Sequence, residues 1–257
     1  MKPLSLSYQS SARGFRLAAL AALLSPFSPA AVFNLTTDFS LASNPNGPWS
    51  YQLNGTNLSF FLPAATGNPG APAYVNGFWS VGNDLNVHTP TLTQTAVDAN
   101  SAGGNTTLDY VAGQIVAHSP NNGGETLFVR WTAPSAGTIT SYAGSVWYAH
   151  SPVTRANDWA ILLGSTTLHS GVVGPADNRT NASTYAGSAL AVNAGDVFSI
   201  ALAKSAGQSF GGLAGLTLGI DFAPSSAVPE PASFALVAGA LALAWAGRRR
   251  QRDHVIR

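Results

Sequence analysis

Apolar and polar residues alternate with a period of two along many short segments of this sequence. Residues 33–41 show the pattern clearly, because Phe33, Leu35 and Phe39 are separated by polar residues. Successive side chains on a β-strand point to opposite faces, so this alternation is typical of strands with one buried face. The body of the chain has no stretch with the sustained 3.6-residue period of an amphipathic helix. The sequence therefore predicts an all-β fold.

The alternation recurs along the body of the chain, and clusters of Gly, Asn, Ser and Pro break it into short pieces. The further strands predicted are residues 49–53, 58–62, 74–80, 114–118, 126–132, 138–149, 159–163, 197–203 and 216–222. Many short strands at this spacing favour an antiparallel β-sandwich or jelly roll. Residues 31–224 are enough for one such domain with a hydrophobic core.

The composition excludes several classes of protein. Charged residues make up 9% of the chain and cysteine is absent, whereas a typical soluble domain has about 25% charged residues. A coiled coil, a disulfide scaffold and a zinc-thiolate protein are therefore excluded. Between Val32 and Ala227 there are nine acidic residues and four cationic ones, a net charge of −5. The four cations are Arg130, Arg155, Arg179 and Lys204. Nucleic acid is thus not expected as a partner.

The first 30 residues have the pattern of a secretory signal peptide, with a basic start, the apolar run 17–24 and small residues before Ala31. The residues that carry it are Lys2, Arg13, Arg16, Ser28 and Ala30. This pattern predicts export through the secretion translocon and cleavage near Ala31. A buried N-terminal helix is the alternative, and the prolines directly behind the apolar run disfavour it.

The C-terminal segment, residues 225–257, reads as a sorting or anchor segment. It combines a Val-Pro-Glu-Pro motif, the apolar run 232–247 and a cluster of arginines. The motif and the cluster consist of Val228, Pro229, Glu230, Pro231, Arg248, Arg249 and Arg250. A helix over the apolar run would be roughly 24 Å long, short of the ~30 Å hydrocarbon core but workable when the arginines snorkel. A transmembrane helix is predicted, with the arginines in the cytoplasm and the body outside the membrane.

This order of parts resembles the PEP-CTERM sorting signal of exported bacterial proteins. The resemblance covers about the last 30 residues. It implies that an exosortase-type processing enzyme recognises and cuts the tail, and that the protein belongs to a system of exopolysaccharide and biofilm production. The protein would sit in the inner membrane before processing and then at the cell surface or outside the cell. An ordinary membrane anchor that is never processed is the alternative.

The body also resembles exported jelly-roll modules that are loosely grouped with carbohydrate-binding domains. The resemblance is carried by the segment Val129–Thr138, which reads VRWTAPSAGT, and by the turn Val192–Val197, which reads VNAGDV. It spans about Asp38–Phe222. It implies a fold more than a function.

One segment matches a catalytic motif. Residues 207–211, Gly-Gln-Ser-Phe-Gly, match the G-x-S-x-G nucleophile elbow of hydrolases, which requires a helix after the serine. The glycine-rich residues 211–215 that follow are poor helix formers, so a chance match is favoured. Glycoside hydrolysis needs two carboxylates, and Glu125 is the one glutamate of the body. No catalytic residue is therefore predicted, and an exported esterase or glycosidase is the alternative.

Two copies of Ala-His-Ser-Pro place His118 and His150 at the ends of predicted strands. The favoured interpretation is structural, with each copy entering a proline turn. A metal site with a nearby acid is the alternative, but no further ligand is evident for the three that catalytic zinc usually requires. No metal or other cofactor is predicted. A structural calcium ion at Asp158 or Asp196 remains open.

Aromatic residues are the remaining candidates for binding. The alternation puts Val146 and Tyr148 on one face of their strand and Trp147 on the other, so one of the two rings is predicted to face solvent and to stack on a sugar. The glycan-stacking candidates are Trp147, Tyr148, Trp79 and Trp159, whereas Trp131 is assigned to the core. The predicted function is that of a non-enzymatic exported surface or matrix protein that contacts polysaccharide.

Overall fold

The computed structural model describes residues 29–63, 75–82, 90–99, 108–150, 153–225 and 240 of the 257-residue chain. Residues 30–225 form one compact unit. Its elements are β1 (Ala31–Asn34), α2 (Leu35–Asp38), β2 (Trp49–Leu53), β3 (Thr56–Asn57), β4 (Phe60–Pro63), β5 (Val75–Ser80), β6 (Thr91–Thr95), β7 (Ile115–His118), β8 (Leu127–Thr132), β9 (Gly137–Tyr148), β10 (Asn157–Leu163), β11 (Thr166–Val173), the 3₁₀ turn η3 (Arg179–Asn181), β12 (Ser183–Val192), β13 (Val197–Lys204) and β14 (Leu213–Pro224).

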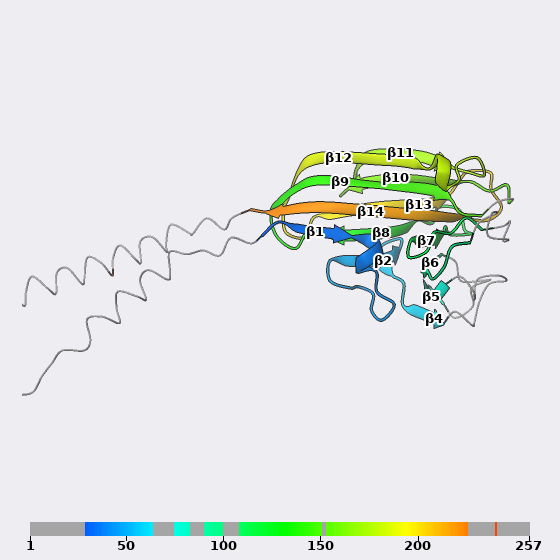
Figure 1. Ribbon diagram of the computed structural model, residues 1–257, viewed down its shortest axis with the longest axis horizontal. Helices are drawn as coiled ribbons and strands as arrows, with labels where there is room; N and C mark the ends of the chain where they lie inside the picture. The colour runs from blue at the N-terminus through cyan, green and yellow to red at the C-terminus, as the bar shows by residue number, and fades with distance from the viewer. Residues whose placement is uncertain are drawn as a thin grey trace, which may run out of the picture. The chain divides into compact units, whose positions relative to one another are not determined.

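The strands form two antiparallel sheets packed as a β-sandwich (Figure 1). Within the described residues, one sheet has eight strands in the order β12-β9-β14-β7-β6-β5-β4, with β1 paired to β14. The other has six strands, in the order β11-β10-β13-β8-β2-β3. The long strand β14 pairs with β9 along one edge and with β7 and then β1 along the other. The predicted antiparallel β-sandwich is confirmed.

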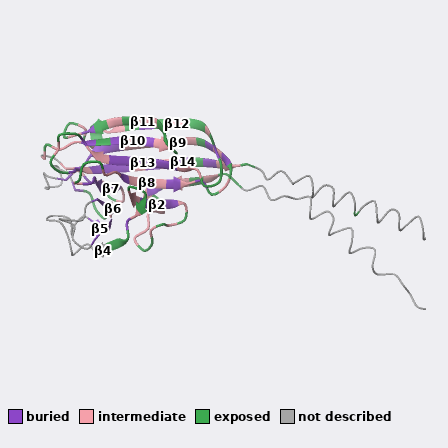
Figure 2. Ribbon diagram, turned by 180° about the vertical axis from the view of Figure 1, so that it is seen from behind, coloured by how far each residue is buried: buried purple, intermediate pink, exposed green. Residues whose placement is uncertain are grey.

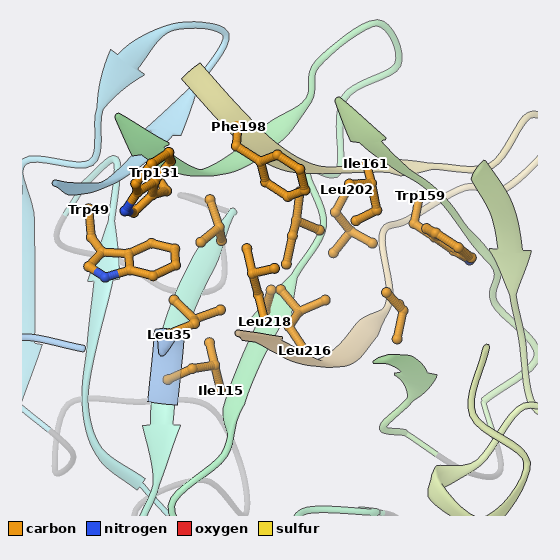
Figure 3. Close-up of a cluster of buried hydrophobic side chains, with 14 of the residues drawn as sticks. Leu35, Trp49, Ile115, Trp131, Trp159, Ile161, Phe198, Leu202, Leu216 and Leu218 are labelled. Atoms are coloured by element: carbon orange, nitrogen blue, oxygen red, sulfur yellow. The ribbon is translucent and has the colours of Figure 1, made fainter. Parts of the chain in front are cut away.

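The core lies between the sheets. In β8, Leu127, Val129 and Trp131 are at most 1% exposed, while the residues between them point to the outer side of the sheet. Side chains of β13, such as Phe198, and of β14, such as Leu218, fill the space between the sheets (Figure 3). Burying each such side chain contributes roughly 1.5–3 kcal/mol. The assignment of Trp131 to the core is confirmed.

Glycines lie directly opposite large aromatic residues at several places in the sheets. The pairs are Trp147–Gly215, Tyr142–Gly187, Tyr185–Gly144 and Trp159–Gly171. A Cβ atom at any of these glycines would meet the ring opposite it. Each ring therefore lies against the backbone of the neighbouring strand, a cross-strand arrangement that only glycine permits.

The strand predicted over residues 33–41 is wrong beyond Asn34. The chain turns there into the short helix α2, because the Asn34 side chain accepts hydrogen bonds from the backbone N–H groups of Thr36 (2.9 Å) and Thr37 (3.4 Å). This is the geometry of a helix N-cap. The apolar residue Leu35 is fully buried in the helix, so the alternation arose without a strand.

Four strands, β3, β6, β11 and β12, were not predicted. β6 reads TLTQT, and β11 and β12 carry Gly, Ser and Thr where an alternating strand would carry apolar residues. β3, β11 and β12 are edge strands, and the burial patterns of β11 and β12 are mostly exposed or intermediate. Their sequences therefore give little of the half-buried signal on which the prediction depended.

The predicted signal peptide and the sorting segment lie almost wholly outside the described residues, so the structure does not test them. Where the structure describes the chain, it has no helix long and apolar enough to cross a membrane.

Candidate functional site

The structure buries the aromatic residues expected to stack on sugars. Trp147 is 3% exposed and Tyr148 is 1% exposed, so the prediction that one of these rings faces solvent is wrong. The two rings do point to opposite faces of β9, as the alternation requires. Tyr148 belongs to the core between the sheets, and Trp147 belongs to a second cluster on the other side of the eight-stranded sheet.

A segment that covers the outer side of this sheet explains the burial of Trp147. Leu108 and Tyr110 pack in the same cluster as Trp147, and the indole N–H donates to the Asp109 carbonyl at 2.9 Å. Arg179 holds this segment in place, because its Nε lies 2.9 Å from Asp109 Oδ1 and its backbone N–H donates to Asp109 Oδ2 at 2.8 Å. The period of a strand indicates its two faces, but it does not show what covers each of them.

The two weaker candidates are also unavailable to a sugar. Trp79 and Trp159 are each 6% exposed. The Trp79 indole N–H donates to the Ser40 carbonyl at 2.7 Å, and Trp159 lies against Gly171.

His118 of the first Ala-His-Ser-Pro copy ends β7, and Ala149 and His150 of the second copy follow β9; both strands pair with β14. Burial lowers the pKa of His118 to about 4, against the raising effect of its 2.7 Å hydrogen bond to the Ser119 carbonyl, and the charges of Arg155 and His150 lower it further. The two side chains whose charges shift the pKa of His118 are thus basic ones. No group of three His, Cys, Asp or Glu side chains gathers within the part of the chain that the structure describes.

Next to His118, a buried polar network fixes the loop of residues 205–212. The Ser119 hydroxyl donates to Asn157 Oδ1 at 2.6 Å, and the Gly212 N–H lies 3.0 Å from Ser119 Oγ and 3.1 Å from Asn157 Oδ1. This loop contains the G-x-S-x-G motif. It joins β13 to β14, so a strand follows the exposed Ser209 where a nucleophile elbow requires a helix.

The remaining acidic candidates stabilise turns. Asp196 Oδ2 accepts from the Asn193 N–H at 2.7 Å, and Asp158 Oδ1 accepts from the Ser205 hydroxyl at 2.5 Å. Glu125 accepts a 3.2 Å hydrogen bond from the nearby Asn122 side chain. A structural calcium ion at Asp158 or Asp196 stays an open alternative that the structure does not test.

A guanidinium stacks on a phenylalanine ring in this 205–212 loop. The Cζ atom of Arg155 lies 5.1 Å from the centroid of Phe210, which is 53% exposed. Arg155 Nη1 also donates to the Gly211 carbonyl at 2.8 Å. Beside it, Lys204 Nζ donates to the Asn121 carbonyl at 2.7 Å. Both cations are therefore bound to backbone carbonyls of the loops that they hold.

A second stack lies on the outer side of the six-stranded sheet, whose strands β8, β10 and β13 run side by side in Figure 2. The Cζ atom of Arg130 lies 4.5 Å from the centroid of Phe128. Neither an ion pair nor a hydrogen bond joins the Arg130 side chain to any described residue, and its Nε is buried without a partner. Burial lowers the pKa of Arg130.

Polar side chains surround Arg130 on this sheet. In the strand register, Arg130 lies opposite Ser50 of β2 and Ser199 of β13, and Phe128 lies opposite Gln52. The Gln52 amide bonds Ser50 and Asn57 through Nε2, while its Oε1 is buried without a partner. We call Ser50, Gln52, Phe128, Arg130 and Ser199 the Arg130 face.

The sequence contained a signal for this face that went unused. Arg130 was counted only as one of the four cations of the body. The same alternation that buries Val129 and Trp131 places Arg130 on the outer side of β8, in a row with the hydroxyls of two neighbouring strands. Its neighbours in that row depend on strand pairing, which the sequence does not show.

No protein-family model and no curated protein matches the chain. Among solved structures, the C-terminal CBM6 of LamC, a marine laminarinase from Zobellia galactanivorans, matches with 19% identity and a TM-score of 0.22 over 41% of this chain and 87% of that chain. A mutant of CBM29-2, a family 29 carbohydrate-binding module, matches with 15% identity and a TM-score of 0.28 over 69% of this chain and 88% of that chain. Both TM-scores are too low to establish the fold or the ligand. The fold itself defines the class: an antiparallel β-sandwich.

Proposed function

We propose that this chain is an exported, non-enzymatic surface protein whose β-sandwich contacts polysaccharide through the Arg130 face. The observation that carries the proposal is the half-buried guanidinium of Arg130, which has no acceptor among the described residues. A charged group that is partly removed from water and left unpaired costs free energy. A ligand rich in oxygen atoms would supply the missing acceptors.

The shape and chemistry of the Arg130 face suit a sugar chain. The face lies across paired strands and presents the half-buried side chains of Arg130 and Gln52, whereas Ser50 and Ser199 beside Arg130 are only 8% and 3% exposed. A guanidinium donates hydrogen bonds and an amide both donates and accepts them, which matches the mixed donor and acceptor pattern of sugar hydroxyls.

Export and sorting are part of the proposal on the evidence of the sequence alone. The signal peptide would direct the chain to the translocon, and the Pro229-Glu230-Pro231 segment would be handled by an exosortase-type enzyme. Intact-mass measurement of the protein released from its host tests this. A released chain that keeps residues 1–30 or the Arg248–Arg250 cluster would contradict it.

Affinity electrophoresis of the full chain through gels containing bacterial exopolysaccharides tests the binding function. Retardation is expected, with at least a tenfold loss of affinity in Arg130→Ala. Thr184→Ala is the control, because Thr184 is exposed on β12 of the other sheet, and it should bind as the wild type does. Unretarded migration in every polysaccharide would overturn the proposed function.

A further inference from the structure

We infer that the sugar chain recognised by the Arg130 face is acidic, and that Arg130 binds the carboxylate of a uronic acid residue. This inference rests on the proposed function and adds the chemical class of the ligand. It is drawn from how Arg130 differs from the other cations of the body and from the groups beside it.

The other cations of the body all have acceptors. Arg179 pairs with Asp109 at 2.9 Å, Arg155 donates to the Gly211 carbonyl, and Lys204 donates to the Asn121 carbonyl. Arg130 has none within the described ranges, although its residue is only partly exposed and its Nε is fully buried. Neutral hydroxyls would satisfy some of its five N–H donors, but only an anion would also offset the cost of desolvating its charge.

The geometry of the site favours a planar anion. The guanidinium presents its N–H donors as a rigid fork that matches the two oxygens of a carboxylate. Because one side of that fork stacks on Phe128, the carboxylate would approach its edge. Ser50 and Ser199 lie directly opposite Arg130 on the two neighbouring strands, where Cβ atoms are about 5 Å apart. Ser50 and Ser199 are only 8% and 3% exposed, so the contact with the sugar carboxylate falls on Arg130.

The net charge of the body opposes this binding only at long range. The segment from Val32 to Ala227 has a net charge of −5, which repels a polyanion. At physiological salt, exposed charges are screened within about 8 Å. A direct contact with a partly desolvated guanidinium is screened much less, so it decides the affinity once the chain is bound.

Binding of the full chain to three polyuronates (polygalacturonate, polyglucuronate and alginate) tests the inference, each compared with the same polymer after its carboxyls are reduced to alcohols. We expect at least one polyuronate to bind tenfold or more tightly than its reduced form. Arg130→Gln should abolish that preference, so that the polyuronate and its reduced form bind equally weakly. Dextran sulfate is a further arm, since a guanidinium also binds sulfate, and it should bind more weakly than the preferred polyuronate.

Arg155→Gln is the matched control, because it removes the same charge from the other Arg–Phe stack, and it should keep the preference. Arg130→Lys keeps the charge but lacks the planar fork, so it should lose most of the preference for the polyuronate. This variant covers the case in which Arg130→Gln does not fold. A polyuronate and its reduced form could instead bind equally well to the wild type, with both lost in Arg130→Lys or Arg130→Gln. That result would overturn the inference of an acidic ligand but leave the proposed function standing. Tighter binding of dextran sulfate would replace the carboxylate with a sulfate ester and overturn the inference as stated. Absence of binding to all of these polymers and to host exopolysaccharide would overturn both.

Discussion

The molecule stacks an arginine on a phenylalanine twice, and the two stacks differ in what surrounds the guanidinium. Arg155 lies over Phe210 in a loop and donates to the Gly211 carbonyl. Arg130 lies over Phe128 on a sheet, at the shorter distance of 4.5 Å, and has no acceptor among the described residues. The same two residue types thus hold a loop in one place and present an unpaired cation in the other.

The backbone explains the difference. In the six-stranded sheet, β8 is paired on both edges, with β2 and β13, so the carbonyl groups around Arg130 are used by the strand ladder. In the 205–212 loop, carbonyl groups such as that of Gly211 have no ladder partner and accept from side chains. Buried backbone groups must be paired, so a loop recruits a cation such as Arg155, whereas a sheet interior offers one such as Arg130 no free carbonyl.

The largest difference between the two stacks is expected in acid. His118 is near Arg155, whose charge lowers its pKa, so protonation of this histidine should destabilise the region of the Arg155–Phe210 stack and not that of the Arg130–Phe128 stack. Burial holds the pKa of His118 at about 4 in the folded chain, with Arg155 and His150 as its charged neighbours, against about 6.5 in an unfolded chain. The contribution of neutral His118 to the free energy of unfolding is complete above pH 6.5. It is lost as the pH falls toward 4, because the unfolded chain then binds a proton that the folded chain does not. The expected loss is about 3 kcal/mol.

Urea denaturation at pH 7 and at pH 4 measures this loss, and His118→Gln is the comparison that isolates it. The variant should lose less stability between the two pH values than the wild type. If both proteins show the same pH dependence, His118 is not the group responsible.

Replacing Arg155 should have the next largest effect on stability. Arg155→Met removes a charge-assisted hydrogen bond to the Gly211 carbonyl and the stack on Phe210, and should lower the free energy of unfolding by about 1–2 kcal/mol. It should also raise the pKa of His118, because the Arg155 charge is one of the causes that lower it, and so reduce the acid effect. A variant as stable as the wild type would show that Arg155 does not hold the loop.

The sequence could predict which face of a strand a residue lies on, but not which distant residues cover that face. Alternation placed Val129 and Trp131 in the core and Tyr148 and Trp147 on opposite faces, because the two faces of a strand follow from local period alone. The covering of Trp147 by Leu108 and Tyr110 depends on contacts between residues about 40 positions apart, which carry no local signal. The stacking prediction failed for that reason.

The Arg130 face was missed for a related reason. Arg130 has the position of an outward residue in its strand, and that much is local. Its lack of an acceptor, and the presence of Ser50 and Ser199 beside it, follow from the pairing of β8 with β2 and β13. Within the described residues, the order of strands in the sheet determines which polar residues form the candidate site.

Double-mutant cycles compare the two stacks directly. The coupling free energy between Arg130 and Phe128 should be about 1 kcal/mol, and that between Arg155 and Phe210 about 0.5 kcal/mol. The first pair is closer, and both of its residues are partly buried, whereas Phe210 is 53% exposed to water. Stabilities of the single and double alanine variants in urea give both values, and a larger coupling at Arg155 would reverse the comparison.

The smallest effect on stability is expected where the effect on binding is largest, in Arg130→Met. The substitution loses the attraction between the guanidinium and Phe128, about 1 kcal/mol. It also removes a cation that burial disfavours, as the lowered pKa of Arg130 indicates, and it leaves a thioether that packs on the same ring. These contributions oppose each other, so the free energy of unfolding should change by less than about 0.5 kcal/mol, measured in urea beside Arg155→Met. A loss as large as that of Arg155→Met would make Arg130 a structural residue. An unchanged stability together with lost polysaccharide binding would mean that the fold does not need the Arg130 cation, and that its unpaired donors serve the ligand.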